Sequence, residues 1–169
     1  HSTLYKWRRL NKMMQNRSIM IVDDDFRTLK SLKLTLELNG YNTDTYANPF
    51  DAQKAFRESH YNCVLLDVYM PGMDGLELLK QILSTKKSPP VIMISGESNI
   101  DTAVESIKLG AYDFFEKPIV SPGRLLVSIR NAIQRQILLE EKEQLSHELE
   151  TNYRMIGNSA EMQKIYATV

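Results

Sequence analysis

The chain has 169 residues, of which 43% are apolar and 25% are charged, which is enough for one well-buried domain and some linker or tail. Its formal charge is zero, but five of its 21 basic residues and none of its 21 acidic residues precede Ser18, so the remainder is mildly acidic. An acidic body gives no electrostatic reason to expect nucleic-acid binding by this segment, and any DNA-reading module is expected outside it.

The first 17 residues show no clean hydrophobic periodicity and begin with His1 rather than Met. We interpret residues 1–17 as a tag, a processed segment or a disordered leader before a native start near Met13 or Met14, and leave them out of the fold prediction. They lack the apolar stretch of a secretion signal, and no apolar run approaches the roughly 18 residues of a membrane-spanning helix. We therefore expect a cytoplasmic protein with no membrane segment.

From Ser18 onward, short apolar runs of strand length alternate with segments whose apolar residues recur at helical spacing. The predicted strands are Ile19–Val22, Asn42–Tyr46, Cys63–Leu66, Val91–Ile94 and Tyr112–Phe115. The predicted helices between them are Phe26–Leu38, Pro49–Ser59, Gly75–Ser84 and Asn99–Leu109. This alternation predicts an α/β fold with a parallel sheet covered on both faces. The single cysteine, Cys63, is expected to be buried, and it excludes a disulfide within the chain.

The second predicted strand differs from the others because Asn42–Thr45 is polar, whereas the first, third and fourth strands are continuously apolar. A polar strand belongs at the edge of such a sheet. The flavodoxin-like, doubly wound sheet with strand order 2-1-3-4-5 has strand two at its edge and strand one inside, so we predict this fold. Functional groups are then expected at the carboxyl ends of strands one, three, four and five.

One long helix is predicted from Arg124 to Glu150, because neither Gly nor Pro interrupts this segment. Its apolar stripe is formed by Leu126, Ile129, Ile133 and Ile137. Such a helix is about 40 Å long at roughly 1.5 Å per residue, too long to lie wholly against a small sheet. We therefore assign residues 18–136 to the globular domain and residues 137–152 to a helical linker.

The linker contains a short, imperfect heptad pattern. Leu138, Leu145 and Leu149 fit the seam of a coiled coil, but Glu141 or Lys142 interrupts it. We predict a modest coiled coil that joins two copies of the chain into a homodimer. A solvated, charged single helix is the alternative.

Four carboxylates follow two of the predicted strands: Asp23, Asp24 and Asp25 after the first, and Asp67 after the third. Adjacent strands bring these like charges together, and clustered oxygen ligands suit Mg²⁺. The structural alternative is that Asp25 caps the next helix and Asp67 opens the turn that follows it. We favour capping for Asp25 alone and a metal site for the cluster.

Two complementary groups follow the remaining strands, namely the hydroxyl of Ser95 and the ammonium of Lys117. The strand-end Asp23-Asp24 pair, the DVYMPGMDG loop that begins at Asp67, Ser95-Gly96 and Lys117-Pro118 together resemble the response-regulator receiver family. The resemblance covers about residues 18–136. Each motif is weak by itself, but all four occur in order on the predicted strand ends, and together they are specific.

The resemblance implies that Asp67 is a regulatory phosphoacceptor that takes a phosphoryl group from a sensor histidine kinase, and that the chain is not an enzyme in the usual sense. It implies that Asp23, Asp24, Asp67 and the backbone carbonyl of Tyr69 hold Mg²⁺. The Lys117 ammonium would offset charge on the phosphoryl oxygens, and the Lys117–Pro118 bond matches the cis peptide of the family.

The same resemblance implies a switch between Ser95 and Phe114. The Ser95 hydroxyl would hydrogen-bond a phosphoryl oxygen, and the space it leaves would be filled by Phe114, which stands at the switch aromatic of the family. An ordinary core Phe is the alternative. Many members have Tyr there, so switching in this chain would act through packing alone. Partners, or a second copy, would contact the face formed by the fourth helix, the fifth strand and the fifth helix.

The segment Tyr153–Ile165 resembles the opening of the AAA+ ATPase module in sigma-54-dependent, NtrC-type transcription activators. A chance helix start with Ser159 as its N-cap is the alternative. Residues 153–169 are therefore interpreted as the start of a truncated module, without the G-x-x-x-x-G-K-[ST] loop that an ATP site needs. DNA and sigma-54 RNA polymerase would be contacted only through domains missing from this chain.

Three other functions compete with the receiver interpretation. Phosphatases of the haloacid dehalogenase type place a second Asp two residues after the nucleophile, where this chain has Tyr69. A nucleotide or flavin carrier would need glycines and free amides in the first turn, where Asp23, Asp24 and Asp25 would repel anions. A pseudo-receiver that only mediates contacts would not need the complete set of site residues.

Overall fold

The computed structural model describes residues 2–14, 16–97 and 99–167. The strands are β1 (Ser18–Val22), β2 (Asn42–Tyr46), β3 (Cys63–Asp67), β4 (Val91–Ser95) and β5 (Asp113–Glu116). The helices are α1 (Ser2–Met14), α2 (Phe26–Leu38), α3 (Pro49–Glu58), α4 (Gly75–Leu83), α5 (Ile100–Leu109) and α6 (Pro122–Ala167). The chain divides into two compact units, His1–Ile133 with the sheet and Gln134–Val169. No described helix combines the length and apolarity that crossing a membrane requires.

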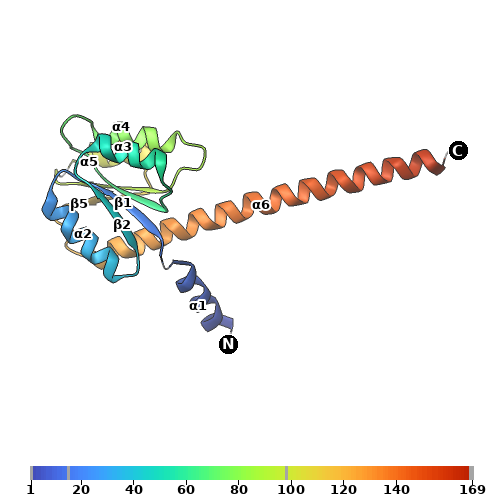
Figure 1. Cartoon of the computed structure of the whole chain (residues 1–169), viewed down its shortest axis with the longest axis horizontal. Helices are drawn as coiled ribbons and strands as arrows, with labels where there is room; N and C mark the ends of the chain where they lie inside the picture. The colour runs from blue at the N-terminus through green and yellow to red at the C-terminus, as the bar shows by residue number, and fades with distance from the viewer. Residues whose placement is uncertain (1, 15, 98, 168–169) are drawn as a thin grey trace. The chain divides into compact units, whose positions relative to one another are not determined.

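The five strands form one parallel sheet in the order β2-β1-β3-β4-β5, which confirms the predicted flavodoxin-like topology and the edge position of β2. Helices α3, α4 and α5 lie on one face of the sheet, and α2 and the start of α6 lie on the other (Figure 1). The predicted bounds of β2 and α2 match the structure, and the other elements of the sheet domain differ by one or two residues at an end.

Four helices of the sheet domain begin at an Asp or Asn side chain. The N-caps of α2, α3, α4 and α5 are Asp25, Asn48, Asp74 and Asn99. Each side chain accepts a hydrogen bond from the backbone N–H two residues ahead, which satisfies one of the free donors of the first turn. The predicted capping role of Asp25 is therefore confirmed.

The core lies on both faces of the three central strands, whose apolar side chains are almost fully buried. Leu29, Leu32 and Leu36 form the buried face of α2, as predicted. Cys63 is a free thiol, and its complete burial raises its pKa to about 12. The thiol is therefore neutral and acts as a small apolar core residue, which confirms the prediction for it.

A helix, α1, occupies Ser2–Met14, within the segment that the sequence analysis interpreted as a tag, a processed segment or a disordered leader and left out of the fold prediction. The segment contains neither Gly nor Pro and is rich in Leu, Lys, Arg and Met, so local helix propensity accounts for the helix. Burial of an apolar face does not account for the helix, because Leu4, Tyr5 and Trp7 are exposed.

Helix α6 is longer than the predicted helix, because it continues past Glu150 and through Gly157. A single Gly inside a helix costs only about 1 kcal/mol, so it does not end this one. In the first unit, α6 buries Leu125 and Ile129, whereas Leu126, predicted to be on the inner face, is only half-buried. The coiled-coil seam stays a prediction.

Candidate functional site

The strand register aligns the predicted functional residues at one edge of the sheet. Val22, the last residue of β1, pairs with Leu66, so Asp23 and Asp67 follow at the same level. Asp67 in turn pairs with Ile94, the residue before Ser95. Asp23, Asp67 and Ser95 therefore stand at the ends of three adjacent strands, β1, β3 and β4, at the same edge of the sheet.

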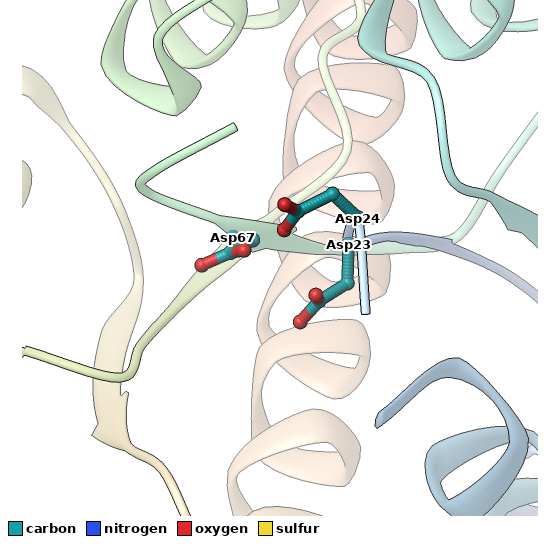
Figure 2. A group of neighbouring side chains, drawn as sticks. All are labelled: Asp23, Asp24 and Asp67. Atoms are coloured by element: carbon teal, nitrogen blue, oxygen red, sulfur yellow. The ribbon is translucent and has the colours of Figure 1, made fainter. Parts of the chain in front are cut away.

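Three carboxylates meet at this edge. One oxygen from each of Asp23, Asp24 and Asp67 lies within 4.8 Å of the other two. Figure 2 shows the three side chains converging from the end of β1 and the end of β3. Asp23 and Asp67 are only 2% and 4% exposed, whereas Asp24 is open to solvent, so the cluster has a buried floor and an accessible side.

Lys117 supplies the positive charge of the cluster. Its Nζ lies 2.5 Å from Oδ2 of Asp23 and 3.3 Å from Oδ2 of Asp67. Its backbone N–H donates to the carbonyl of Ser95 at 2.8 Å, and the Lys117–Pro118 peptide is cis, as predicted. The ammonium is thus fixed between two of the three acids.

The electrostatics of the cluster favour a protonated Asp67. Burial is the main cause that raises the pKa of Asp67 to about 7, and the charge of Asp23 adds to it, against the opposing influence of Lys117. Burial also lowers the pKa of Lys117, but its contacts with Asp23 and Asp67 outweigh this and raise the pKa overall. One ammonium does not balance three carboxylates.

The residues present fit a divalent cation. Oδ1 of Asp23 accepts a hydrogen bond from the backbone N–H of Asp25 at 2.8 Å, but Oδ2 of Asp23 is buried with no hydrogen bond beyond its ion pair with Lys117. Three acids with convergent oxygens are the ligand type of Mg²⁺. Asp23, Asp24 and Asp67 would hold the ion.

Ser95 and Phe114 lie on the adjacent strands β4 and β5, with Phe114 two register positions before the level of Ser95. Ser95 is fully buried, and within the described part of the chain its hydroxyl bonds the backbone of Glu97, with N–H···Oγ at 3.2 Å and Oγ to the carbonyl oxygen at 3.3 Å. Phe114 pairs with Met93 on β4 and packs, half-buried, against the core. Ser95 follows Ile94, the register partner of Asp67, whereas Phe114 lies one strand further away.

The loop after Asp67 depends on a glycine that the sequence analysis did not single out. Gly75 donates its backbone N–H to the carbonyl of Val68 at 2.7 Å and so closes the loop. A Cβ at Gly75 would lie 2.0 Å from the backbone oxygen of Asp67 and 2.8 Å from Cα of Val68. Only the absence of a side chain allows α4 to begin this close to the acidic cluster.

Residues 19–130 match the family described as the response regulator receiver domain. The chain belongs to this family. The chain is 33% identical over 155 residues to the C4-dicarboxylate transport transcriptional regulatory protein DctD of Rhizobium meliloti (strain 1021), covering 90% of this chain and 34% of the relative. The chain is also 38% identical over 153 residues to the nitrogen assimilation regulatory protein NtrX of Azorhizobium caulinodans, covering 89% of this chain and 33% of the relative.

Solved receiver structures agree with the fold. A receiver domain protein (CheY-like) from Methanospirillum hungatei JF-1 has a TM-score of 0.68 at 32% identity and covers 76% of this chain and 99% of its own. NtrX from Brucella abortus, in complex with ADP, has a TM-score of 0.73 at 34% identity, and the match covers 78% of this chain and 30% of NtrX. The chain therefore spans about a third of the length of the regulators that it matches.

The raised pKa of Asp67 predicts how the stability of this receiver depends on pH. The carboxyl titrates near 3.8 when unfolded and near 7 when folded, so between these values the folded receiver holds a proton that the unfolded chain has lost. The metal-free receiver should therefore lose stability as pH rises through this window. Asp67→Asn has no carboxyl to titrate at this position. The difference in free energy of unfolding, variant minus parent, should therefore be larger at about pH 8 than at about pH 4 by roughly 1–3 kcal/mol.

Urea denaturation of both proteins at the two pH values, with a chelator present, measures this difference. Mg²⁺ should reduce it at high pH by neutralising the carboxylates. An equal difference at both pH values would show that Asp67 titrates normally in the folded protein.

Proposed function

We propose that this chain is the phosphorylation-dependent receiver of a two-component response regulator, in which Asp67 accepts a phosphoryl group from a sensor histidine kinase. The observation that carries the proposal is the buried Asp67 carboxylate, which lies at a strand end beside two further acids and within 3.3 Å of Lys117. A carboxylate with an adjacent cation and an open side is suited to in-line attack on a phosphoryl donor.

The chemical step forms one bond and breaks one. A carboxylate oxygen of Asp67 attacks phosphorus, the bond from phosphorus to the donor imidazole breaks, and the electron pair of that bond stays on the imidazole. Lys117 holds the attacking carboxylate and faces the developing charge on the phosphoryl oxygens. Mg²⁺, held by Asp23, Asp24, Asp67 and the Tyr69 carbonyl, would neutralise further charge on these oxygens.

The deprotonated form of Asp67 is the nucleophile. Its raised pKa means that a cation at the cluster also promotes reaction by favouring that form. In this proposal the negative charges of Asp23 and Asp24 repel that of Asp67 when no cation is bound, and Mg²⁺ removes this repulsion when it binds.

Phosphorylation would be transmitted through Ser95 and Phe114. Among the described residues, the Ser95 hydroxyl bonds the backbone of Glu97 at 3.2 and 3.3 Å, and these long contacts would be exchanged for one to a phosphoryl oxygen. Phe114 is half-buried next to β4 and can move into the space that is left. Because Phe114 has no hydroxyl, the change would depend on packing alone.

The signal would reach transcription through a homodimer. Two surfaces offer apolar side chains to a second copy: Ile100, Val104 and Ile107 on α5, and Leu138, Leu145 and Leu149 on α6. DctD is named a transcriptional regulatory protein and NtrX a regulatory protein, which supports a role in transcription. We assign this role to sigma-54-dependent transcription, with DNA and polymerase contacted by domains outside this chain. The protein would act in the cytoplasm.

Incubation with acetyl phosphate and Mg²⁺, followed by intact-mass spectrometry, tests the proposal. We expect the mass of one phosphoryl group to be added, to depend on Mg²⁺ and to disappear when a chelator is present from the start. The bound group should be lost in alkali, as an acyl phosphate is. A receiver that gains no mass under these conditions would contradict phosphoacceptor function.

Ser95→Ala separates acceptance from switching. We expect the variant to accept phosphoryl groups, with a rate lowered by up to about tenfold because one hydrogen bond to a charged oxygen is lost. Amide NMR with Mg²⁺ and beryllofluoride should show that the shift at Phe114 is largely lost in Ser95→Ala. Ser95→Thr keeps the hydroxyl and should retain the shift. Equal shifts in all three proteins would remove Ser95 from the switch.

A further inference from the structure

Helix α5 has its polar side toward the sheet and its apolar side toward solvent. Its buried residues are Thr102 and Ser106, at 7% and 0% exposure. Its large apolar side chains point outward, with Ile100 80%, Val104 46% and Ile107 48% exposed. This is the reverse of the usual arrangement in a surface helix.

Few apolar contacts therefore hold α5 in place. The preceding helix, α4, buries Leu78, Leu79 and Ile82 almost completely in the core. Among the described residues of α5, the one that packs against this core cluster is the partly buried Leu109, at the far end of the helix. A helix with so little buried apolar area belongs to the low end of local stability, where a single hydrogen bond has a measurable effect.

One such bond joins the start of α5 to the loop that carries the acceptor. The hydroxyl of Tyr69 lies 3.2 Å from Oγ1 of Thr102. Tyr69 is two residues after Asp67, and Thr102 lies in the first turn of α5. Thr102 is buried, at 7% exposure, whereas Tyr69 is 44% exposed, so the bond is shielded from water on the helix side and open on the loop side.

The rest of the Thr102 turn is also fixed by hydroxyl groups. Ser106, one turn further on, donates its hydroxyl to the backbone carbonyl of Thr102 at 2.8 Å. Thr102 is thus held twice, by Tyr69 of the acceptor loop through its side-chain hydroxyl and by Ser106 of the inner face of α5 through its backbone carbonyl. Any displacement of the Tyr69 backbone at the acidic cluster acts directly on the bond to Thr102.

We propose that the Tyr69 and Thr102 hydroxyls form a clasp that transmits occupancy of the Asp67 site to α5. The inference rests on the proposed function, because occupancy means phosphoryl transfer or its mimic. Tyr69 is a positioning residue here: in the proposed function its backbone carbonyl is a ligand of Mg²⁺, and its side-chain hydroxyl contacts Thr102 of α5. The route is separate from the Ser95 and Phe114 switch, which runs through β4 and β5.

Hydrogen exchange of the α5 amides tests the clasp in the full chain, with Mg²⁺ alone and with Mg²⁺ plus beryllofluoride. Tyr69→Phe and Thr102→Val each remove one hydroxyl and keep the size of the side chain. Without beryllofluoride, each should accelerate exchange in the first two turns of α5 by about two- to tenfold, as expected for one hydrogen bond. The double variant should show no further acceleration, because both changes break the same bond.

The response to beryllofluoride is the decisive comparison, made at equal occupancy as judged by the amide shifts at the cluster. In the parent, α5 exchange should change on loading, and in both single variants at least half of this change should be lost. Thr102→Ser restores a hydroxyl and should restore the response, whereas Tyr153→Phe, a matched loss of an exposed hydroxyl on α6, should have no effect. An unchanged α5 response in Tyr69→Phe and Thr102→Val overturns the clasp.

Failure of the clasp and failure of the proposed function give different results. If the parent takes up no phosphoryl group and binds no beryllofluoride, the phosphoacceptor function is wrong, and transmission through the clasp is wrong with it. If the parent is loaded and α5 responds equally with and without the two hydroxyls, phosphoacceptor function stands and the clasp alone is excluded.

Discussion

Asp67→Asn should reduce phosphoryl uptake from acetyl phosphate by at least about a hundredfold, because an amide is not a nucleophile toward phosphorus. The substitution preserves the size of the side chain and removes one of three clustered negative charges, so the fold should be retained. Time courses of phosphoryl uptake at saturating Mg²⁺, read by intact mass, measure the rate for each protein.

Asp25→Asn is the matched control. Asp25 belongs to the same acidic run, but its side chain caps α2 and lies outside the three-carboxylate cluster. Asn is an equally good N-cap, so both stability and uptake should stay close to those of the parent. Uptake by Asp67→Asn at the rate of Asp25→Asn would mean that another group is the acceptor.

Gly75→Ala should have the largest effect on stability. A Cβ at this position would lie 2.0 Å from the backbone oxygen of Asp67, and backbone at the end of β3 cannot move aside as a flexible side chain could. We expect a loss of about 3 kcal/mol or more in the free energy of unfolding, together with weaker binding of Mg²⁺, because the strain falls on the acceptor itself. Urea denaturation and titration with Mg²⁺ measure both effects.

Gly123→Ala provides the comparison for Gly75→Ala. Nothing lies within 4 Å of a Cβ at Gly123, which is the second residue of α6. Ala there should be neutral or stabilising by up to about 1 kcal/mol. Similar small effects at both glycines would contradict the close approach of α4 to β3.

Hydrophobic patterning was sufficient to predict the sheet. Strands buried on both faces have to be continuously apolar, and the polar β2 can only be tolerated at an edge, so the strand order followed from five short segments. The helices of the sheet domain were also readable, since an Asp or Asn cap precedes each of α2 to α5.

The acidic cluster was predictable for a topological reason. Parallel strands in register end at the same edge, so a carboxylate that follows β1 has to lie near one that ends β3. The position of Lys117 between Asp23 and Asp67 fits this prediction, but the distances that join them come from the structure. The roles assigned to the site residues stay proposals.

Other features depend on contacts that no local pattern reveals. The need for glycine at position 75 arises from how closely α4 approaches β3, and the bond between Tyr69 and Thr102 joins residues that are 33 positions apart. The orientation of α5 contradicts the amphipathic rule, because its large apolar residues face solvent. Helix α1 lies in a segment left out of the fold prediction, because its propensity, and not its periodicity, favours a helix.

The most direct test is to identify the residue that carries the phosphoryl group. The protein is phosphorylated with acetyl phosphate and Mg²⁺, reduced with borohydride, which converts an aspartyl phosphate to homoserine, and mapped by peptide mass spectrometry. We expect homoserine at position 67 and nowhere else in the acidic cluster. Homoserine at Asp23 or Asp24, or none at all in a protein that has gained phosphoryl mass, would contradict Asp67 as the acceptor.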